Sequence, residues 1–125
     1  MMKKILVIED EVFIRENLIE LLEIEGYEVM GAENGAVGVE SAKEYQPDLI
    51  LCDVMMPELD GYGVLQALRK DPLTAAIPFI FLTASADRNN LQQIRELGFN
   101  DYILKPFNVD KFLAAIAKRF GEDQS

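Results

Sequence analysis

Residues 49–61, LILCDVMMPELDG, place one carboxylate, Asp53, directly after four apolar residues that are typical of a buried strand. An isolated ionised aspartate is costly to bury without partners. Either the strand assignment is wrong, or the fold holds Asp53 at the end of a strand for its chemistry. The rest of the chain decides between these two interpretations.

The composition limits the class of protein. The chain has 125 residues, half of them apolar, which fits one domain with a single core. Acidic residues outnumber basic residues 22 to 12, giving a net charge of −10, and no basic stripe offers a surface for phosphates. We therefore expect no direct nucleic-acid binding. No stretch approaches the length of a membrane span, so we expect no membrane insertion and a soluble, cytoplasmic protein.

Histidine and cysteine usage excludes further classes of site. The chain has no histidine, so a His-based triad and imidazole metal ligation are both excluded. Its one cysteine, Cys52, cannot form an internal disulfide, and within an apolar run it is most simply a small core residue.

Short apolar runs alternate with segments of helical periodicity. The runs are residues 5–8, 28–30, 49–52, 79–82 and 102–104, the second being the weakest. In the first helical segment one face is apolar, and Arg15 is among the residues expected to face solvent. The predicted helix boundaries are Gly26 ending the first helix, Asn34-Gly35 opening the second, Pro57 in the first turn of the third, Gly98 ending the fourth and Asn108 capping the fifth. The alternation predicts five β/α units around a parallel sheet.

Polar residues follow most of the predicted strands. They are Glu9-Asp10-Glu11 after the first, Asp53 after the third, Thr83-Ala84-Ser85 after the fourth and Lys105-Pro106 after the fifth. In an open parallel α/β sheet, ligands bind outside the carboxyl ends of the strands, so these groups are expected to share one rim. Acids that must stay ionised together suit a hard divalent cation, and Mg²⁺ typically takes one or two carboxylates, a carbonyl and several waters.

Each of these residues also has an ordinary structural explanation. Acids after a first strand often lie at a helix N-terminus, where the helix dipole favours them. A threonine at a strand end is commonly a strand former, and a lysine before proline is commonly a solvated turn residue. Asp60 and Gly61 are by default ordinary loop or helix-start residues. The joint occurrence of four complementary groups at four strand ends outweighs these explanations.

The sequence closely resembles the response-regulator receiver domains of two-component signalling, and in particular the single-domain chemotaxis type. The resemblance rests on LVIEDE at 6–11, LILCDVMMPELDG at 49–61, FLTA at 81–84 and DYILKPF at 101–107. It covers residues 3–120 and leaves 121–125 as a short C-terminal tail. It implies a flavodoxin-like α/β fold, a doubly wound five-stranded parallel sheet with five helices.

The resemblance also implies the site residues. Asp53 would accept a phosphoryl group, and Glu9, Asp10, Asp53 and the backbone carbonyl of Met55 would hold Mg²⁺, with Mn²⁺ as an alternative. Glu9 stands where many relatives have aspartate. That departure lengthens the side chain by one methylene and is compatible with coordination directly or through water.

A switch is implied as well. Thr83 and Lys105 would contact the phosphoryl group, and Tyr102 would be the aromatic side chain that rotates. In the resting state the Lys105 ammonium would pair with Asp53. The fourth helix, fifth strand and fifth helix would then change as one output surface.

The implied partners are a sensor histidine kinase or a histidine phosphotransfer protein as donor, and a downstream protein target on the output surface. The chain would be no enzyme beyond its own phosphorylation from a donor and slow autodephosphorylation. Relatives that dimerise through the output surface commonly carry an acid and an arginine on the last helix. Lys111 and Ala115 stand there in this chain, so we expect a monomer or a weak dimer.

Two other functions compete with this one. A metal-dependent phosphatase of the haloacid-dehalogenase type also uses an aspartate at a strand end, but it generally has a second aspartate where this chain has Met55. A binding module that never accepts phosphate, either receiver-like or a flavin carrier, is the other. A flavin carrier would need a phosphate-binding loop after the first strand, where this chain supplies acids and no glycine.

Overall fold

The computed structural model describes residues 2–83, 92, 96, 102–105 and 108–121. They belong to two compact units, Met1–Leu82 and Thr83–Ser125, and each is described by itself. The strands are β1 (Lys4–Ile8), β2 (Glu28–Ala32), β3 (Leu49–Asp53), β4 (Phe79–Thr83) and β5 (Tyr102–Leu104), in the sheet order β2-β1-β3-β4-β5. The helices are α1 (Val12–Ile24), α2 (Gly35–Tyr45), α3 (Gly61–Lys70) and α5 (Val109–Arg119). The α/β fold with a five-stranded parallel sheet is confirmed.

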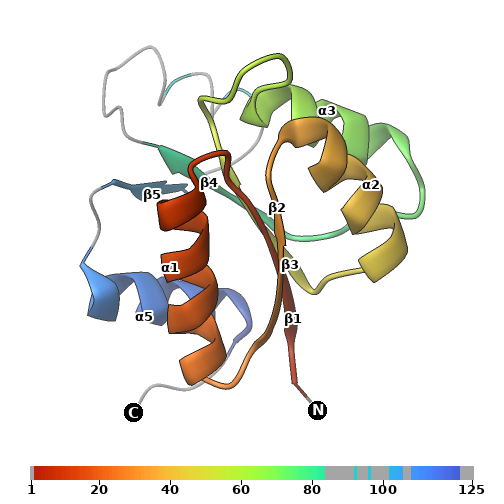
Figure 1. The fold of residues 1–125 in the computed structure, drawn as a ribbon. Coiled ribbons are helices and arrows are strands. Elements are labelled where there is room, and N and C mark those ends of the chain that lie inside the picture. The colour runs from red at the N-terminus through yellow and green to blue at the C-terminus, as the bar shows by residue number, and fades with distance from the viewer. Residues whose placement is uncertain (1, 84–91, 93–95, 97–101, 106–107, 122–125) are drawn as a thin grey trace. The chain divides into compact units, whose positions relative to one another are not determined.

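The first unit is a parallel sheet covered on both faces. Strand β1 pairs in parallel with β2 and β3, and β3 pairs in parallel with β4. Helix α1 covers one face of these strands, and α2 and α3 lie side by side on the other (Figure 1). All five residues of β3 are buried, which explains its continuous apolar sequence up to Asp53. Because the strands are parallel, the ends of β1 and β3 lie at the same edge of the sheet.

Most predicted helix boundaries in the described residues are confirmed. The Asn34 side chain accepts a hydrogen bond from the N–H of Val37, and the Asn108 side chain accepts one from the N–H of Lys111. Each donor lies three residues after its acceptor, as expected for an N-cap residue. Gly26 follows α1 with a φ of 97°, a left-handed conformation that favours glycine. The predicted end of the fourth helix, Gly98, lies outside the described residues.

The prediction for Pro57 is wrong. Helix α3 begins at Gly61, and its N-cap is Asp60, whose carboxylate accepts the N–H of Gly63. Pro57 lies in the preceding turn, where the N–H of Leu59 donates to the Pro57 carbonyl at 2.8 Å and Glu58 adopts a φ of 68°. The helix begins only after this turn, where the Asp60 side chain accepts the free N–H of Gly63.

The solvent-facing prediction for Arg15 is also wrong. Leu18 and Leu22 are buried as the apolar pattern predicts, but Arg15 is half-buried. Its Nη1 donates a hydrogen bond to the carbonyl of Glu9 at 2.8 Å. A long cationic side chain can cover apolar surface while its head group finds a polar partner, and helical periodicity does not reveal that partner.

Candidate functional site

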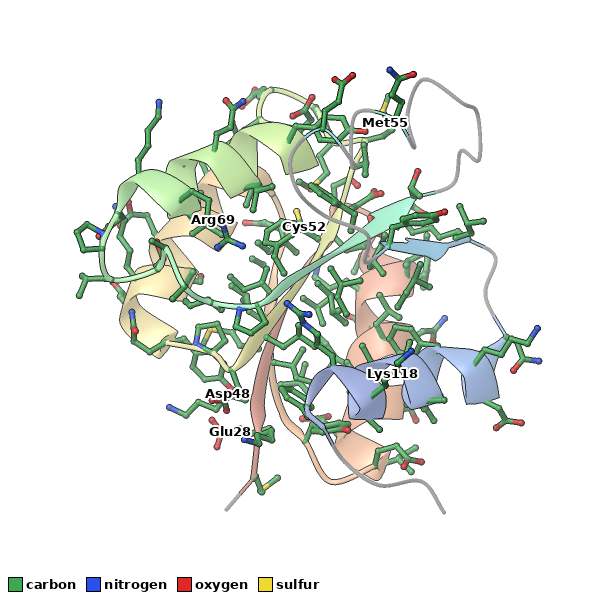
Figure 2. All side chains as sticks on the ribbon, turned by 180° about the vertical axis from the view of Figure 1, so that it is seen from behind. Glu28, Asp48, Cys52, Met55, Arg69 and Lys118 are labelled. Carbon is green, nitrogen blue, oxygen red and sulfur yellow. The ribbon has the colours of Figure 1, made fainter. Side chains whose placement is uncertain are left out.

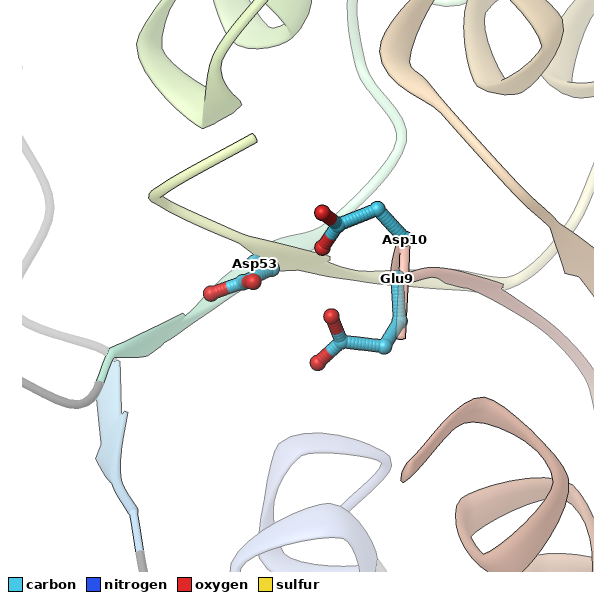
Figure 3. A group of neighbouring side chains, drawn as sticks. All are labelled: Glu9, Asp10 and Asp53. Atoms are coloured by element: carbon cyan, nitrogen blue, oxygen red, sulfur yellow. The ribbon is translucent and has the colours of Figure 1, made fainter. Parts of the chain in front are cut away.

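Three carboxylates meet where β1 and β3 end. One oxygen from each of Glu9, Asp10 and Asp53 lies within 4.8 Å of the other two. Figure 3 shows Glu9 and Asp10 reaching the cluster from the end of β1, and Asp53 from the end of β3. Glu9 is fully buried and Asp53 nearly so, whereas Asp10 is exposed. The strand assignment in the opening stretch is therefore correct, and Asp53 is placed at the strand end beside other acids.

The end of β1 is held by backbone hydrogen bonds. The N–H of Glu9 donates to the carbonyl of Ala32 at 3.1 Å, which extends the pairing with β2 by one residue. The Glu9 carboxylate accepts the N–H of Glu11 at 3.3 Å. Glu11 is the N-cap residue of α1, but its own side chain makes no capping hydrogen bond. Of the three acids after β1, Glu9 and Asp10 therefore belong to the cluster, and the Glu11 side chain does not cap α1.

The loop after β3 is fixed by a close backbone approach. The N–H of Val54 donates to the Leu82 carbonyl, and the N–H of Gly61 donates to the Val54 carbonyl, both at 2.9 Å. A Cβ atom on Gly61 would lie 2.5 Å from the carbonyl oxygen of Asp53. Only glycine lets the start of α3 pack against the strand end in this way. Met55 lies in the loop so formed, with its side chain 72% exposed.

The second unit contains the other predicted site residues. Thr83 ends β4 and is fully buried, and its carbonyl accepts the N–H of Lys105 at 2.7 Å. Tyr102 begins β5 and is half-buried. The structure therefore places Thr83 and Lys105 on adjacent backbone segments. Ala84, Ser85 and Pro106 lie outside the described residues.

The acid cluster fits a magnesium ion in the chemistry of its donors. Carboxylate oxygens are the ligands that hard divalent cations take in proteins, and Mg²⁺ needs only one or two of them beside a carbonyl and waters. Three negative charges this close repel one another, and two of them are buried, so a cation would offset a real cost. The described residues thus form an acidic cluster of the kind that holds Mg²⁺.

A second polar cluster lies at the opposite end of the strands. Figure 2 shows Glu28 and Asp48 there, with Met55 at the other end. The Tyr45 hydroxyl donates to the Glu28 carboxylate at 2.9 Å, and the Lys4 ammonium lies 5.1 Å from the centre of the Tyr45 ring. Burial and this hydrogen bond to Glu28 raise the pKa of Tyr45 to about 12. The cluster ties the start of β1 to the end of α2 and is structural.

Two residues that support the site were not identified from the sequence. The sequence alone predicts an ordinary loop or helix-start residue at Gly61, although its missing Cβ lets α3 approach Asp53. Helical periodicity predicts that Arg15 faces solvent, although its Nη1 donates a hydrogen bond to the carbonyl of Glu9. The Asp60-Gly61 pair is a recognisable sequence signal for the role of Gly61, but no sequence pattern indicates the hydrogen bond of Arg15.

Comparison with known proteins agrees with this geometry. The family model described as "Response regulator receiver domain" matches residues 5–117. The probable transcriptional regulator ycf27 of Porphyridium aerugineum is 45% identical over 114 residues, which are 91% of this chain and 46% of that protein. The polar-differentiation response regulator DivK of Brucella anthropi is 34% identical over 98% of this chain and 99% of its own length. The chain thus spans about half the length of the first of these relatives and nearly all of the second.

Solved structures share the fold. The chemotaxis protein CheY4 of Vibrio cholerae superposes with a TM-score of 0.88 at 28% identity, over 94% of this chain and 98% of that one. Among the residues that the structure describes, no helix is both long and apolar enough to cross a membrane.

Proposed function

Because this chain belongs to the family of response regulator receiver domains, signalling modules of two-component systems that histidine kinases phosphorylate, we propose that Asp53 is its phosphoacceptor. The donor would be a phosphohistidine on a sensor histidine kinase or on a histidine phosphotransfer protein. The observation that carries the proposal is the convergence of Glu9, Asp10 and Asp53 at the carboxyl ends of β1 and β3.

The reaction is a phosphoryl transfer. An Asp53 carboxylate oxygen attacks phosphorus, an O–P bond forms, and the N–P bond to the donor imidazole breaks, which leaves an acyl phosphate on Asp53. Little covalent chemistry is left to the protein, so its residues act by position and charge. The fixed end of β3 and the Gly61 approach keep the Asp53 carboxylate at the open edge of the sheet.

Glu9, Asp10, Asp53 and the Met55 carbonyl would together hold Mg²⁺ at this edge, with Mn²⁺ as an alternative. A bound magnesium ion supplies positive charge where the transferred oxygens accumulate negative charge. Glu9 is buried and accepts the N–H of Glu11, so its carboxylate is held in place before any ion binds. Asp10 is exposed and can meet the ion from the solvent side.

Thr83, Lys105 and Tyr102 would read the phosphorylated state. The Lys105 ammonium would neutralise phosphoryl oxygens and the Thr83 hydroxyl would donate to one of them. The half-buried Tyr102 would then change rotamer, and β5 with the helices beside it in sequence would dock on a downstream protein. The backbone hydrogen bond between Lys105 and Thr83 supports this role, because it couples the two residues directly.

Intact-mass spectrometry after incubation with Mg²⁺ and acetyl phosphate tests the proposal. The wild-type protein should gain one phosphoryl group, and Asp53→Asn or an excess of chelator should abolish the gain. Asp48→Asn is the matched control, since Asp48 precedes the same strand at the opposite end and should leave labelling unchanged. Labelling of Asp53→Asn to the same extent as the wild-type protein would show that Asp53 is not the phosphoacceptor.

A further inference from the structure

We propose that Arg15 is a positioning residue for the metal site, because its guanidinium holds the peptide group that joins Glu9 and Asp10. The inference rests on the proposed magnesium site. Arg15 lies in the first turns of α1, and it points back to the end of β1 rather than outward into solvent.

The hydrogen bonds of Glu9 carry the argument. The Glu9 carbonyl accepts from Arg15 Nη1 at 2.8 Å, and the Glu9 N–H donates to the Ala32 carbonyl at 3.1 Å. The peptide planes on both sides of this residue are therefore held. Since the Glu9 carbonyl and the Asp10 N–H share one rigid plane, the guanidinium also fixes the direction in which Asp10 leaves the strand.

Strand β2 leaves room for the Arg15 side chain at Gly31. A Cβ atom on Gly31 would lie 3.1 Å from Cδ of Arg15 and 2.8 Å from Cδ1 of Ile19. The aliphatic part of the Arg15 side chain thus passes over β2 at Gly31, whose side chain is only a hydrogen atom. Three elements, α1, β1 and β2, combine to place one guanidinium on one carbonyl.

The direction in which Mg²⁺ affinity changes when Arg15 is removed distinguishes a positioning role from a purely electrostatic one. A guanidinium near a cation site repels the cation, so if Arg15 acted only through its charge, its removal would tighten Mg²⁺ binding. Loss of a residue that orients metal ligands weakens binding instead, typically by about 10- to 100-fold. The two roles therefore predict opposite changes in affinity.

The experiment measures the Mg²⁺ dissociation constant of the whole chain by calorimetric titration at constant ionic strength. Arg15→Met should weaken binding by about tenfold, and Arg15→Lys should recover most of the affinity, because lysine keeps the stem and one donor. Arg69→Met is the matched control. Arg69 Nη1 also donates to backbone carbonyls, those of Ala75 and Ile77, so its loss removes equivalent bonds without touching the acids.

Gly31→Ala provides an independent variant. The added methyl group would lie 3.1 Å from Cδ of Arg15 and push that side chain by a few tenths of an ångström, so binding should weaken by less than in Arg15→Met, and the double variant should be no weaker than Arg15→Met alone. Wild-type affinity or tighter binding in Arg15→Met overturns the inference, as does an equal loss in Arg69→Met. Absence of Mg²⁺ binding by the wild-type protein overturns the metal site itself, which distinguishes the two failures.

Discussion

Asp53→Asn is expected to raise the free energy of unfolding of the metal-free protein and to reduce the stabilisation that added magnesium provides. The substitution keeps the shape of the side chain and removes one of three charges whose nearest oxygens lie within 4.8 Å of one another. Two repulsive pairs, with Glu9 and with Asp10, are lost. The remaining cluster keeps fewer ligands for a cation, so the variant gains less from Mg²⁺.

The magnitude follows from Coulomb's law. A pair of charges 4.8 Å apart repels by about 3.5 kcal/mol at an effective dielectric constant of ~20 and by about 0.9 kcal/mol at ~80. Asp10 is exposed, so its pair falls near the lower value, and other polar contacts of Asp53 offset part of the gain. We expect the metal-free variant to unfold with a free energy about 1–2 kcal/mol higher, a rise of roughly 4 °C per kcal/mol in melting temperature.

Thermal denaturation followed by circular dichroism, in chelator and in Mg²⁺ at matched ionic strength, is the assay. The wild-type protein should gain about 2.7 kcal/mol when Mg²⁺ is present at ~100 times its dissociation constant, and the variant, which keeps fewer ligands, should gain less at the same concentration. Glu20→Gln, an exposed acid in the middle of α1, controls for the change in net charge. A lower melting temperature of metal-free Asp53→Asn would refute the reasoning, because attractive contacts would then outweigh the repulsion.

Three further predictions concern single residues. Glu58→Gly should raise the free energy of unfolding by up to about 1 kcal/mol in urea titrations, because Glu58 has a φ of 68° and glycine adopts that conformation without strain; a loss would count against strain there. Asn108→Ala should lower it by about 1 kcal/mol through loss of the cap on the Lys111 N–H, and an unchanged midpoint would mean that the cap contributes nothing. Spectroscopic titration should find Tyr45 ionising near pH 12, and Glu28→Gln should lower the pKa of Tyr45 toward 10 without reaching it, since burial remains. Because that pKa is raised on folding, the stabilisation is present below about pH 10 and is lost as the pH rises through 12; a tyrosine titration curve that Glu28→Gln leaves unchanged would contradict this assignment.

The fold could be predicted from the sequence because strands and helix ends are indicated by local residue patterns. Five apolar runs coincide with the five strands, and Asn34 and Asn108 cap helices through contacts with residues three positions away. The acid cluster was also predictable, because parallel strands place their carboxyl ends at one edge of the sheet. Asp53 could be recognised by its contrast with a strand that is buried throughout.

The features that the sequence did not reveal depend on packing between distant residues. The charged side chain and helical position of Arg15 predict that it faces solvent, yet its hydrogen-bond partner is a backbone carbonyl at the end of β1. The space that it uses exists only because Gly31 lies in β2, sixteen positions further along the chain. Pro57 fits a helix start by propensity, but the turn at Glu58 and the Asp60 cap set the true start at Gly61.

Chemical trapping of the phosphorylated residue tests the central claim most directly. The protein is incubated with acetyl phosphate and Mg²⁺, reduced with borohydride, which converts an aspartyl phosphate to homoserine, and mapped by peptide mass spectrometry. The account predicts homoserine at position 53 in the magnesium-treated sample and unmodified Asp53 in the sample with chelator. Homoserine at another aspartate, or its formation at position 53 to the same extent without magnesium, would contradict the account.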